Sequence, residues 1–243
     1  MRCSCCGEEV GSVSKCPICG SEIAPKTVSA VEPAVKETHI TGADIFEQNV
    51  NGVMELSVRS GLAFFSGSGY LINSQGYAIT NSHVVVEEGK LCDQCTAIIA
   101  GERIEAQVVA IGTKSDFCSN NDLAIIKLKR VPAKAKPLRF ADSSKVRTGE
   151  QIYIIGNSLG EGTCITAGII SDNDRRGQFM YDSATNGGNS GGPVFNQDGH
   201  VIATHVKGKR DKEGAKAQGM NGGIPCIYAK RMLDENYIRY ESD

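Results

Sequence analysis

The sequence has no tryptophan, no large excess of either charge and no long apolar run. Its formal net charge is -2, so there is no overall electrostatic attraction to nucleic acid or to an anionic membrane. A transmembrane helix needs about 20 predominantly apolar residues in succession, and the sequence contains no such stretch. The first residues also lack the apolar segment of a secretory signal. We therefore expect neither nucleic acid nor a membrane as a partner, and we expect a cytoplasmic location.

Cysteine and glycine, in contrast, are abundant, with 10 and 28 residues. Without an export signal, metal binding or free thiols are more typical of so many cysteines than disulfides are. Composition divides the chain into three segments. A cysteine-rich segment covers residues 1–23, a linker of mixed Ala, Val, Pro, Lys and Glu covers 24–40, and a single domain covers 41–243.

The domain from residue 41 onward contains many short apolar segments separated by Gly, Asn and Asp, which is typical of an all-β barrel or sandwich. A short helix is expected before the strands, over Asp44–Asn49, and a helix over Tyr228–Tyr240 closes the domain. The predicted strands are Val53–Val58, Leu62–Phe65, Gly69–Ile72, Tyr77–Thr80, Thr96–Ala100, Ile104–Ile111, Leu123–Leu128, Gln151–Ile155, Thr163–Ser171, Gln178–Asp182, Gly192–Phe195 and His200–Val206.

Two CxxC pairs lie close together in the first segment: Cys3 with Cys6, and Cys16 with Cys19. Zn²⁺ prefers four tetrahedral ligands, and a CxxC turn lets two thiolates reach one ion. So few residues cannot build a core, and metal binding would supply on the order of 10 kcal/mol of folding free energy. The segment resembles the short zinc ribbons at the ends of many bacterial and archaeal proteins, which implies a structural zinc. Cys5 is an additional thiol that is able to replace a neighbour as ligand; a disulfide knot or unconnected thiols are the alternative.

Peptide hydrolysis by serine needs a nucleophile, a base within hydrogen-bond reach, an acid that orients the base, and amide donors for the oxyanion. The glycine-rich segment Gly187–Pro193 suits the nucleophile Ser190, with the N–H groups of Gly188 and Ser190 as oxyanion donors. His83 follows an apolar strand and suits the base. Asp122 begins another apolar strand, where an ion is costly unless it is paired. Asp116 is the nearest competitor for the acid.

The order His, Asp, Ser is that of the chymotrypsin class. The domain resembles trypsin-like proteases of the bacterial HtrA and glutamyl-endopeptidase kind, from about residue 43 to 233. The resemblance implies two six-stranded β-barrels, chymotrypsin-like, with the triad in the cleft between them. HtrA proteases usually carry a PDZ domain after the protease domain, and we expect no regulation through such a module here. The stretches that carry the resemblance are Ser66-Gly67-Ser68-Gly69, Thr80-Asn81-Ser82-His83-Val84-Val85, Asp122-Leu123-Ala124, Ile155-Gly156-Asn157-Ser158-Leu159-Gly160 and Gly188-Asn189-Ser190-Gly191-Gly192-Pro193.

Thr185 and His205 lie at the offsets from Ser190 at which glutamyl endopeptidases place a Thr and a His in the primary specificity pocket. A hydroxyl and an imidazole are able to donate hydrogen bonds to a carboxylate or a carboxamide. Ala184 puts no negative charge where trypsin has one. We therefore predict cleavage after Glu, with Asp or Gln as further choices; a structural role for His205 is the alternative.

Five further cysteines lie inside the domain. Cys92, Cys95 and Cys118 are candidates for a second zinc site, with free thiols or a Cys92–Cys95 disulfide as alternatives; Cys164 and Cys226 are unassigned. The sequence as a whole predicts a serine endopeptidase acting on peptides or proteins, with a structural zinc. The alternative is a catalytically silent protease fold that serves as a scaffold and binds a protein partner through the ribbon.

Overall fold

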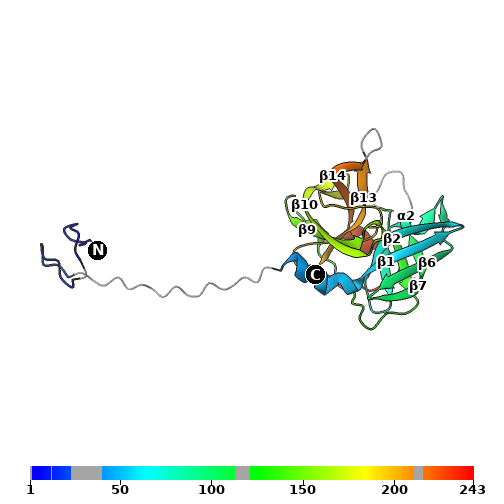
Figure 1. Ribbon diagram of the computed structural model, residues 1–243, viewed down its shortest axis with the longest axis horizontal. Coiled ribbons are helices and arrows are strands. Elements are labelled where there is room, and N and C mark those ends of the chain that lie inside the picture. The colour runs from blue at the N-terminus through cyan, green and yellow to red at the C-terminus, as the bar shows by residue number, and fades with distance from the viewer. Residues whose placement is uncertain (1, 12, 23–39, 113–120, 211–215) are drawn as a thin grey trace. The chain divides into compact units, whose positions relative to one another are not determined.

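The computed structural model describes residues 2–11, 13–22, 40–112, 121–210 and 216–243, with the backbone alone at 207, 209–210 and 216–218. The chain divides into two compact units, Met1–His39 and Ile40–Asp243 (Figure 1). The predicted linker, apart from Ile40, lies outside the described residues, as do Asp116 and Cys118.

Six strands form the first closed antiparallel barrel of the larger unit, in the order β1-β2-β3-β8-β7-β6. Successive side chains in a strand point to opposite faces, and β1 directs Met54, Leu56 and Val58 into the barrel interior. The strands are β1 (Val53–Ser60), β2 (Ala63–Leu71), β3 (Tyr77–Thr80), β6 (Gln94–Ile99), β7 (Glu102–Ile111) and β8 (Ala124–Leu128).

The second closed barrel follows in the chain, in the order β10-β11-β14-β13-β12-β9. Its interior holds Ile152, Ile154, Val194 and Ile202 among other apolar residues. The predicted double six-stranded barrel is therefore confirmed. The strands are β9 (Gln151–Asn157), β10 (Thr163–Arg175), β11 (Gln178–Tyr181), β12 (Pro193–Phe195), β13 (Val201–Arg210) and β14 (Lys216–Pro225).

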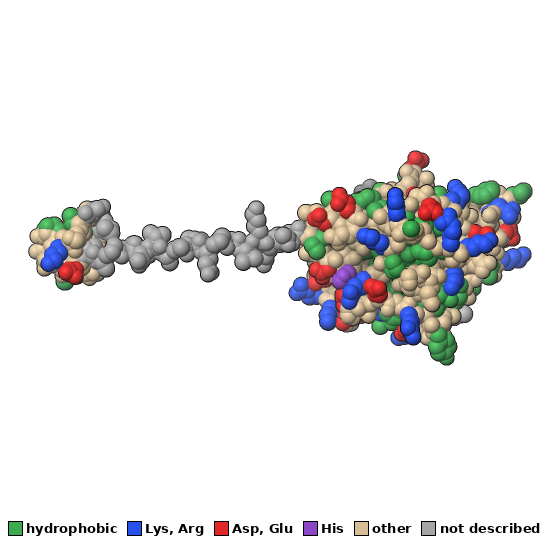
Figure 2. Space-filling model, turned by 90° about the horizontal axis from the view of Figure 1, so that it is seen from below, with side chains coloured by type: hydrophobic (Ala, Val, Ile, Leu, Met, Phe, Trp, Pro, Cys, Tyr) green, Lys and Arg blue, Asp and Glu red, His purple; other side chains and the backbone are tan. Residues whose placement is uncertain are grey.

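Short elements complete the larger unit. They are α1 (Gly42–Asn49), η1 (Val50–Gly52), α2 (Ser82–Val85), the hairpin of β4 (Val86–Glu87) and β5 (Lys90–Leu91), η3 (Ser143–Lys145), η4 (Ser158–Gly160) and α3 (Cys226–Glu235). No helix in the described part of the chain has the length and apolar character needed to cross a membrane. On the face of the larger unit drawn in Figure 2, acidic and basic side chains are interspersed, in keeping with the small net charge.

The closing helix α3 is shorter than predicted. It ends at Glu235 because Tyr237 adopts a left-handed φ of 58°. The Ile238 amide then donates to the Leu233 carbonyl at 2.9 Å, a chain reversal that is typical of helix C-termini. Residues 236–240, which the sequence predicted to be helical, therefore lie outside the helix.

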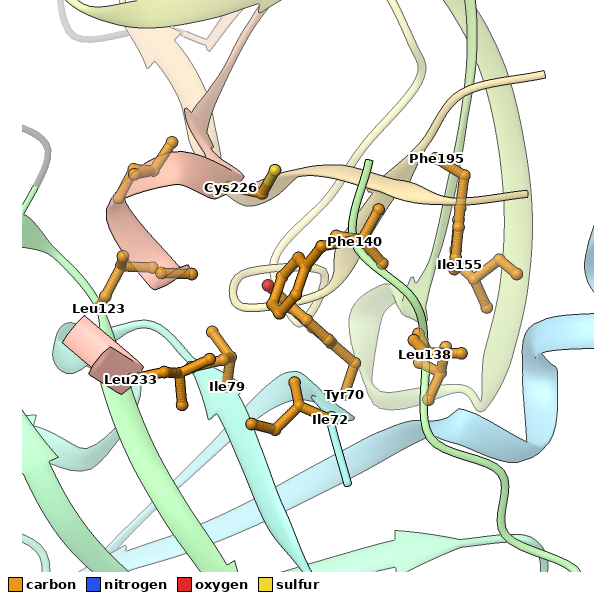
Figure 3. Close-up of a cluster of buried hydrophobic side chains, with 14 of the residues drawn as sticks. Tyr70, Ile72, Ile79, Leu123, Leu138, Phe140, Ile155, Phe195, Cys226 and Leu233 are labelled. Carbon is orange, nitrogen blue, oxygen red and sulfur yellow. The ribbon is translucent and has the colours of Figure 1, made fainter. Parts of the chain in front are cut away.

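A third apolar cluster lies between the two barrels (Figure 3). Tyr70 from the first barrel packs edge-on against Phe140, with ring centroids 6.1 Å apart, and Leu233 of α3 joins the same cluster. The Tyr70 hydroxyl lies 2.9 Å from Thr204 Oγ1 of the second barrel, so the buried phenol is also hydrogen-bonded. This cluster fixes the barrels against each other and thereby positions residues that come from both.

Two of the differences between the predicted and the observed strands involve glycine. The strands predicted over Leu62–Phe65 and Gly69–Ile72 form one strand, β2. A Cβ on Gly67 would lie 2.6 Å from Val84 Cγ1, and one on Gly69 would lie 3.0 Å from the Ile79 carbonyl oxygen, so these glycines permit close packing within a strand. Strand β14, where no strand was predicted, also contains glycines, at Gly219, Gly222 and Gly223.

Candidate active site

His83 and Asp122 are brought together by neighbouring strands. His83 lies in α2 directly after β3, and Asp122 comes just before β8, which pairs with β3. The His83 Nδ1 atom lies 2.6 Å from Asp122 Oδ2, and the His83 amide donates to Asp122 Oδ1 at 2.9 Å. The imidazole and the carboxylate predicted from sequence are thus in direct contact.

Two neighbours that the sequence did not identify also hold Asp122. The Ser82 hydroxyl donates to Oδ1 and the Asn81 side-chain amide donates to the Asp122 carbonyl, each at 2.7 Å. Burial by itself would raise the pKa of Asp122, but the hydrogen bonds and charge of His83, together with Ser82, outweigh burial and lower it. An ionised Asp122 accepts the hydrogen on His83 Nδ1, which leaves Nε2 of the neutral ring as a proton acceptor.

The nucleophile loop contains a tight turn from Asn186 to Asn189, closed by the Asn189 amide donating to the Asn186 carbonyl at 3.3 Å. Gly188 has a φ of 93°, as the third residue of a type II turn requires. A Cβ on Gly188 would lie only 2.0 Å from the Asn157 carbonyl oxygen. Glycine is therefore required at this position for both conformation and space.

The direction of the Gly188 amide follows from its neighbours. The Leu159 amide donates to the Gly187 carbonyl at 2.7 Å, and the peptide that joins Gly187 to Gly188 is trans. In a planar trans peptide the C=O and N–H groups point in opposite directions, so the Gly188 N–H points away from Leu159. Among the described residues, the N–H groups of Gly188 and Ser190 have no hydrogen-bond acceptor, and both amides remain available as donors.

The Ser190 hydroxyl donates to the backbone carbonyl of Val206. In the described hydrogen bonds it is therefore not paired with His83. The backbone around Ser190 nevertheless packs against the strand end that leads to His83: a Cβ on Gly191 would lie 2.3 Å from Thr80 Oγ1. The nucleophile loop therefore lies beside the strand end that leads to His83.

Ser68 is a further site residue for which the sequence assigned no role. Its buried hydroxyl donates to the Gly188 carbonyl at 2.7 Å and accepts from the Asn157 amide at 2.8 Å, and its amide donates to the Ser190 carbonyl at 2.8 Å. The Ser66–Gly69 motif carried the family resemblance and was the available signal. Ser68 thus links the first barrel to the nucleophile loop.

The predicted pocket residues Thr185 and His205 are both buried. The backbone of His205 pairs with the nucleophile loop, because its amide donates to Gly192 at 2.8 Å and its carbonyl accepts from Gly191 at 2.9 Å. The Thr185 hydroxyl donates to Asn221 Oδ1 at 2.7 Å. Both residues therefore belong to hydrogen-bonded networks beside Ser190.

The four N-terminal cysteines Cys3, Cys6, Cys16 and Cys19 converge in the small unit. Their sulfur atoms all lie within 4.8 Å of one another, and Cys3–Cys19 and Cys6–Cys16 are each separated by 3.6 Å. Four sulfurs bound to Zn²⁺ at about 2.3 Å in a tetrahedron lie about 3.8 Å apart. The spacing of the thiols therefore fits a zinc ion.

The two halves of this unit repeat the same local structure. The Gly7 amide donates to the Cys3 carbonyl, and the Gly20 amide donates to the Cys16 carbonyl, each at 2.9 Å. Both glycines have positive φ values, 77° and 71°. Each CxxC pair thus ends in a glycine turn that directs two sulfurs to one point.

The cysteines of the larger unit do not form a comparable group among the described residues. Cys92 and Cys95 are free thiols, and burial raises the pKa of both, that of Cys95 to about 12. Cys118 lies outside the described residues, so a second zinc site stays a prediction. The buried Cys226 thiol donates to the Ala141 carbonyl at 3.3 Å, and Cys164 is exposed.

The larger unit has two antiparallel barrels joined by an apolar cluster, and an imidazole–carboxylate pair lies next to a glycine-bordered serine. These features define the chymotrypsin-like class of folds. The family model described as a trypsin-like peptidase domain matches residues 67–203, and the chain belongs to this family.

Similar proteins carry related names. The chain is 32% identical over 177 residues to a probable periplasmic serine endoprotease DegP-like of Brucella suis, covering 70% of this chain and 32% of that protein. A protein of the same name from Chlamydia muridarum is 32% identical over 178 residues, covering 70% and 33%. The chain thus spans about a third of the length of these curated relatives.

Solved structures of proteases have a similar fold. The HtrA-type protease AlgW with tripeptide superposes with a TM-score of 0.67 at 27% identity, covering 79% of this chain and 62% of that one. The serine endoprotease from Yersinia pestis gives a TM-score of 0.65 at 24% identity, covering 79% and 64%, which bears on the fold alone.

The expected cytoplasmic location is wrong by this comparison, because the relatives are named periplasmic proteins. The expectation depended on the composition of the first residues and on cysteine usage. Neither of these features belongs to the peptidase fold itself.

Proposed function

We propose that this chain is a serine endopeptidase with His83, Asp122 and Ser190 as its catalytic triad. The observation that carries the proposal is the 2.6 Å contact between His83 Nδ1 and Asp122 Oδ2, next to a nucleophile loop in its turned conformation. The names of the similar proteins support the same activity.

In the proposed reaction, Ser190 turns from the Val206 carbonyl towards His83. The hydroxyl proton passes to His83 Nε2 while Ser190 Oγ forms a bond to the substrate carbonyl carbon. Asp122 stabilises the imidazolium and keeps the ring oriented. The C–N bond of the substrate then breaks, His83 returns the proton to the leaving amine, and water hydrolyses the acyl-enzyme by the same steps.

The amides of Gly188 and Ser190 are the proposed oxyanion hole. Negative charge develops on the substrate carbonyl oxygen during attack, and fixed N–H donors stabilise it without reorganisation. The availability of both amides among the described residues supports this role.

For specificity, we infer a preference for Glu before the scissile bond, with Asp or Gln as further choices, through Thr185 and His205. Both side chains are polar and buried beside the nucleophile loop, where an apolar group would otherwise be expected. To donate to a substrate, the Thr185 hydroxyl would turn from Asn221 Oδ1, to which it donates at 2.7 Å. Buried donors favour a substrate group that accepts their hydrogen bonds and penalise one that does not.

Two peptides that differ only in Glu or Leu before the scissile bond test the activity and the preference together. We expect the wild-type protein to cleave the Glu peptide faster, Ser190→Ala to cleave neither, and the exposed-site control Ser144→Ala to match wild type. Equal cleavage of the two peptides would remove the preference and leave the activity; cleavage by Ser190→Ala would remove the triad.

The alternative function is a catalytically silent scaffold that binds a protein partner through the N-terminal unit. It is favoured if folded wild-type protein hydrolyses no member of a peptide library. The intact His83–Asp122 pair argues for the enzyme, because a scaffold has no need of a half-buried carboxylate held ionised beside an imidazole.

We also propose a structural zinc ion bound by Cys3, Cys6, Cys16 and Cys19. The fit between sulfur spacing and a tetrahedral tetrathiolate supports it, as does the absence of a sizeable apolar core among the described residues of this unit. Metal analysis of the full chain should give one zinc that is lost in Cys16→Ser and kept in Cys5→Ser. A second zinc in wild type would point to Cys92, Cys95 and Cys118.

A further inference from the structure

Three consecutive residues at the start of α2 bond to Asp122. The Asn81 side-chain amide donates to the Asp122 carbonyl oxygen, and the Ser82 hydroxyl donates to Oδ1, each at 2.7 Å. His83 donates its backbone amide to Oδ1 at 2.9 Å and places its Nδ1 atom 2.6 Å from Oδ2. The base and the acid of the proposed triad are thus held together by one short segment of the chain.

The two oxygens of the Asp122 carboxylate have different partners. Oδ2 faces the His83 ring, whereas Oδ1 accepts from the Ser82 hydroxyl and from the His83 amide. Without the Ser82 hydroxyl, the His83 amide would still hold Oδ1, so Oδ2 would stay aimed at the ring. The effect of the Ser82 hydroxyl on the pair is therefore electrostatic more than steric.

A hydroxyl that donates to a carboxylate places the positive end of its O–H dipole against the negative charge. It stabilises the ionised acid and weakens the attraction of that acid for a proton or a neighbouring cation. Burial raises the pKa of Asp122, and the contacts with His83 and the Ser82 hydroxyl lower it. The same dipole opposes the positive charge that His83 acquires when its ring is protonated.

We propose that Ser82 is a positioning residue that acts through Asp122: its hydroxyl weakens the hold of the carboxylate on the His83 imidazolium and thereby extends peptide hydrolysis to lower pH. The inference rests on the proposed function, since it assumes that neutral His83 is the base that activates Ser190. A base accepts a proton only while its own site for that proton is empty. Any group that makes the imidazolium less stable therefore widens the pH range of the enzyme.

Other charges around the pair act on every variant alike. The described side chains with a charge or an imidazole on β2, β3, β8, β13 and the β4–β5 hairpin are Lys127, His205, Glu87, Glu88 and Lys90. Lys127 lies over the Tyr77 ring at 4.0 Å, and Glu87 pairs with Lys90 across the hairpin. All of these groups are kept when Ser82 is replaced, so their influence cancels between wild type and variant.

The test is the pH profile of kcat/KM for one peptide, measured with wild type and Ser82→Ala from about pH 5 to about pH 8. The acidic limb of such a profile reports protonation of the base in the free enzyme. We expect Ser82→Ala to move this limb to higher pH by on the order of half a unit, which lowers kcat/KM about threefold below the limb. A limb that stays in place or moves to lower pH would overturn the proposal.

Two further variants separate this effect from a change of structure. Ser82→Thr keeps a hydroxyl and should restore the wild-type limb. Ser144→Ala is the matched control, because it removes another serine hydroxyl that donates to a carboxylate, that of Asp142 at 2.6 Å, outside the proposed site. Its limb should coincide with that of wild type. An equal movement in Ser82→Ala and Ser82→Thr, or in Ser144→Ala, would count against the Ser82 hydroxyl.

Proton NMR of Ser190→Ala protein gives a readout that needs no activity. The hydrogen between His83 Nδ1 and Asp122 Oδ2 should give a downfield signal, which His83→Asn in the same background identifies by its loss. We expect Ser82→Ala to move this signal further downfield, since the charge returned to Asp122 strengthens the hydrogen bond, and Ser82→Thr to leave it in place. A signal that Ser82→Ala does not move would overturn the proposal. The expected movement in a protein whose Ser190 form cleaves no peptide would instead count against the proposed function.

Discussion

The Ser190 hydroxyl is hydrogen-bonded to the Val206 carbonyl, while Gly188, in the turn just before it, has a φ of 93°. A side chain and a backbone loop relax on different timescales. Exposed side-chain rotations take picoseconds to nanoseconds, whereas collective rearrangements take microseconds or longer. We expect attack to need only a rotation of the Ser190 side chain and no rearrangement of the loop.

We accordingly predict that peptide hydrolysis starts without a lag. Progress curves recorded by stopped flow from the first milliseconds should be linear, with no dependence of a lag on prior incubation with peptide. A lag of seconds would mean that the loop, and not merely the Ser190 side chain, must rearrange.

A second prediction concerns the glycine pair in the turn. Gly188→Ala would place a Cβ 2.0 Å from the Asn157 carbonyl oxygen at a φ of 93°, so the amide has to move out of place. We expect kcat to fall on the order of 10²–10³-fold, as for loss of one oxyanion donor. Gly187→Ala is the matched control, because a Cβ there has no neighbour within 4 Å and should leave most activity. Equal losses in the two variants would argue against this assignment.

A third prediction separates the two serines of the Ser66–Gly69 motif. Ser68→Ala leaves the Gly188 carbonyl and the Asn157 amide without their buried partner, which should cost about 1–3 kcal/mol of unfolding free energy and also lower kcat. Ser66→Ala, at an exposed site in the same strand, should change neither. Denaturant unfolding and peptide kinetics measure both quantities. A Ser68→Ala protein as stable and as active as wild type would show that this link is dispensable.

A fourth prediction follows from the lowered pKa of Asp122. A carboxyl group with a folded-state pKa below its unfolded value, about 3.9, contributes stability that is complete above that value. The contribution is lost as pH falls through the folded-state pKa. The difference in unfolding free energy between wild type and Asp122→Asn should therefore shrink as pH is lowered below about 4.

Urea unfolding at a series of acidic pH values checks this linkage. Asp198→Asn, at an exposed site, serves as the control and should differ little from wild type throughout. A wild-type advantage over Asp122→Asn that grows as pH falls below about 4 would contradict the lowered pKa of Asp122.

Strand positions were predictable because alternating apolar residues and turn residues are local signals, as at Tyr77–Thr80, where the predicted and observed strands coincide. The contact between His83 and Asp122 was predictable for a related reason, since each residue lies in its own short motif, while the triad with Ser190 stays a prediction. Glycines lie where the predicted strands differ from the observed ones, at β14 and within β2. A glycine that permits close packing, such as Gly69 beside Ile79, looks the same in sequence as one that ends a strand.

Residues that act through distant partners were not predictable. The hydroxyl of Ser68 meets the Gly188 carbonyl across 120 residues of chain, and the hydroxyl of Tyr181 meets both His205 and the Gly222 carbonyl. No local pattern identifies such pairs, because they exist only once the barrels have closed. The cellular compartment could not be predicted for a different reason, because the peptidase fold does not indicate it.

The most direct test of the central claim is to locate the adduct of a fluorophosphonate probe on the intact protein by peptide mass spectrometry. A serine made nucleophilic by His83 and Asp122 should be labelled at a single position, Ser190, and His83→Ala should lose the label while remaining folded. An adduct on another serine, or labelling of Ser190 that is unaffected by His83→Ala, would contradict the account.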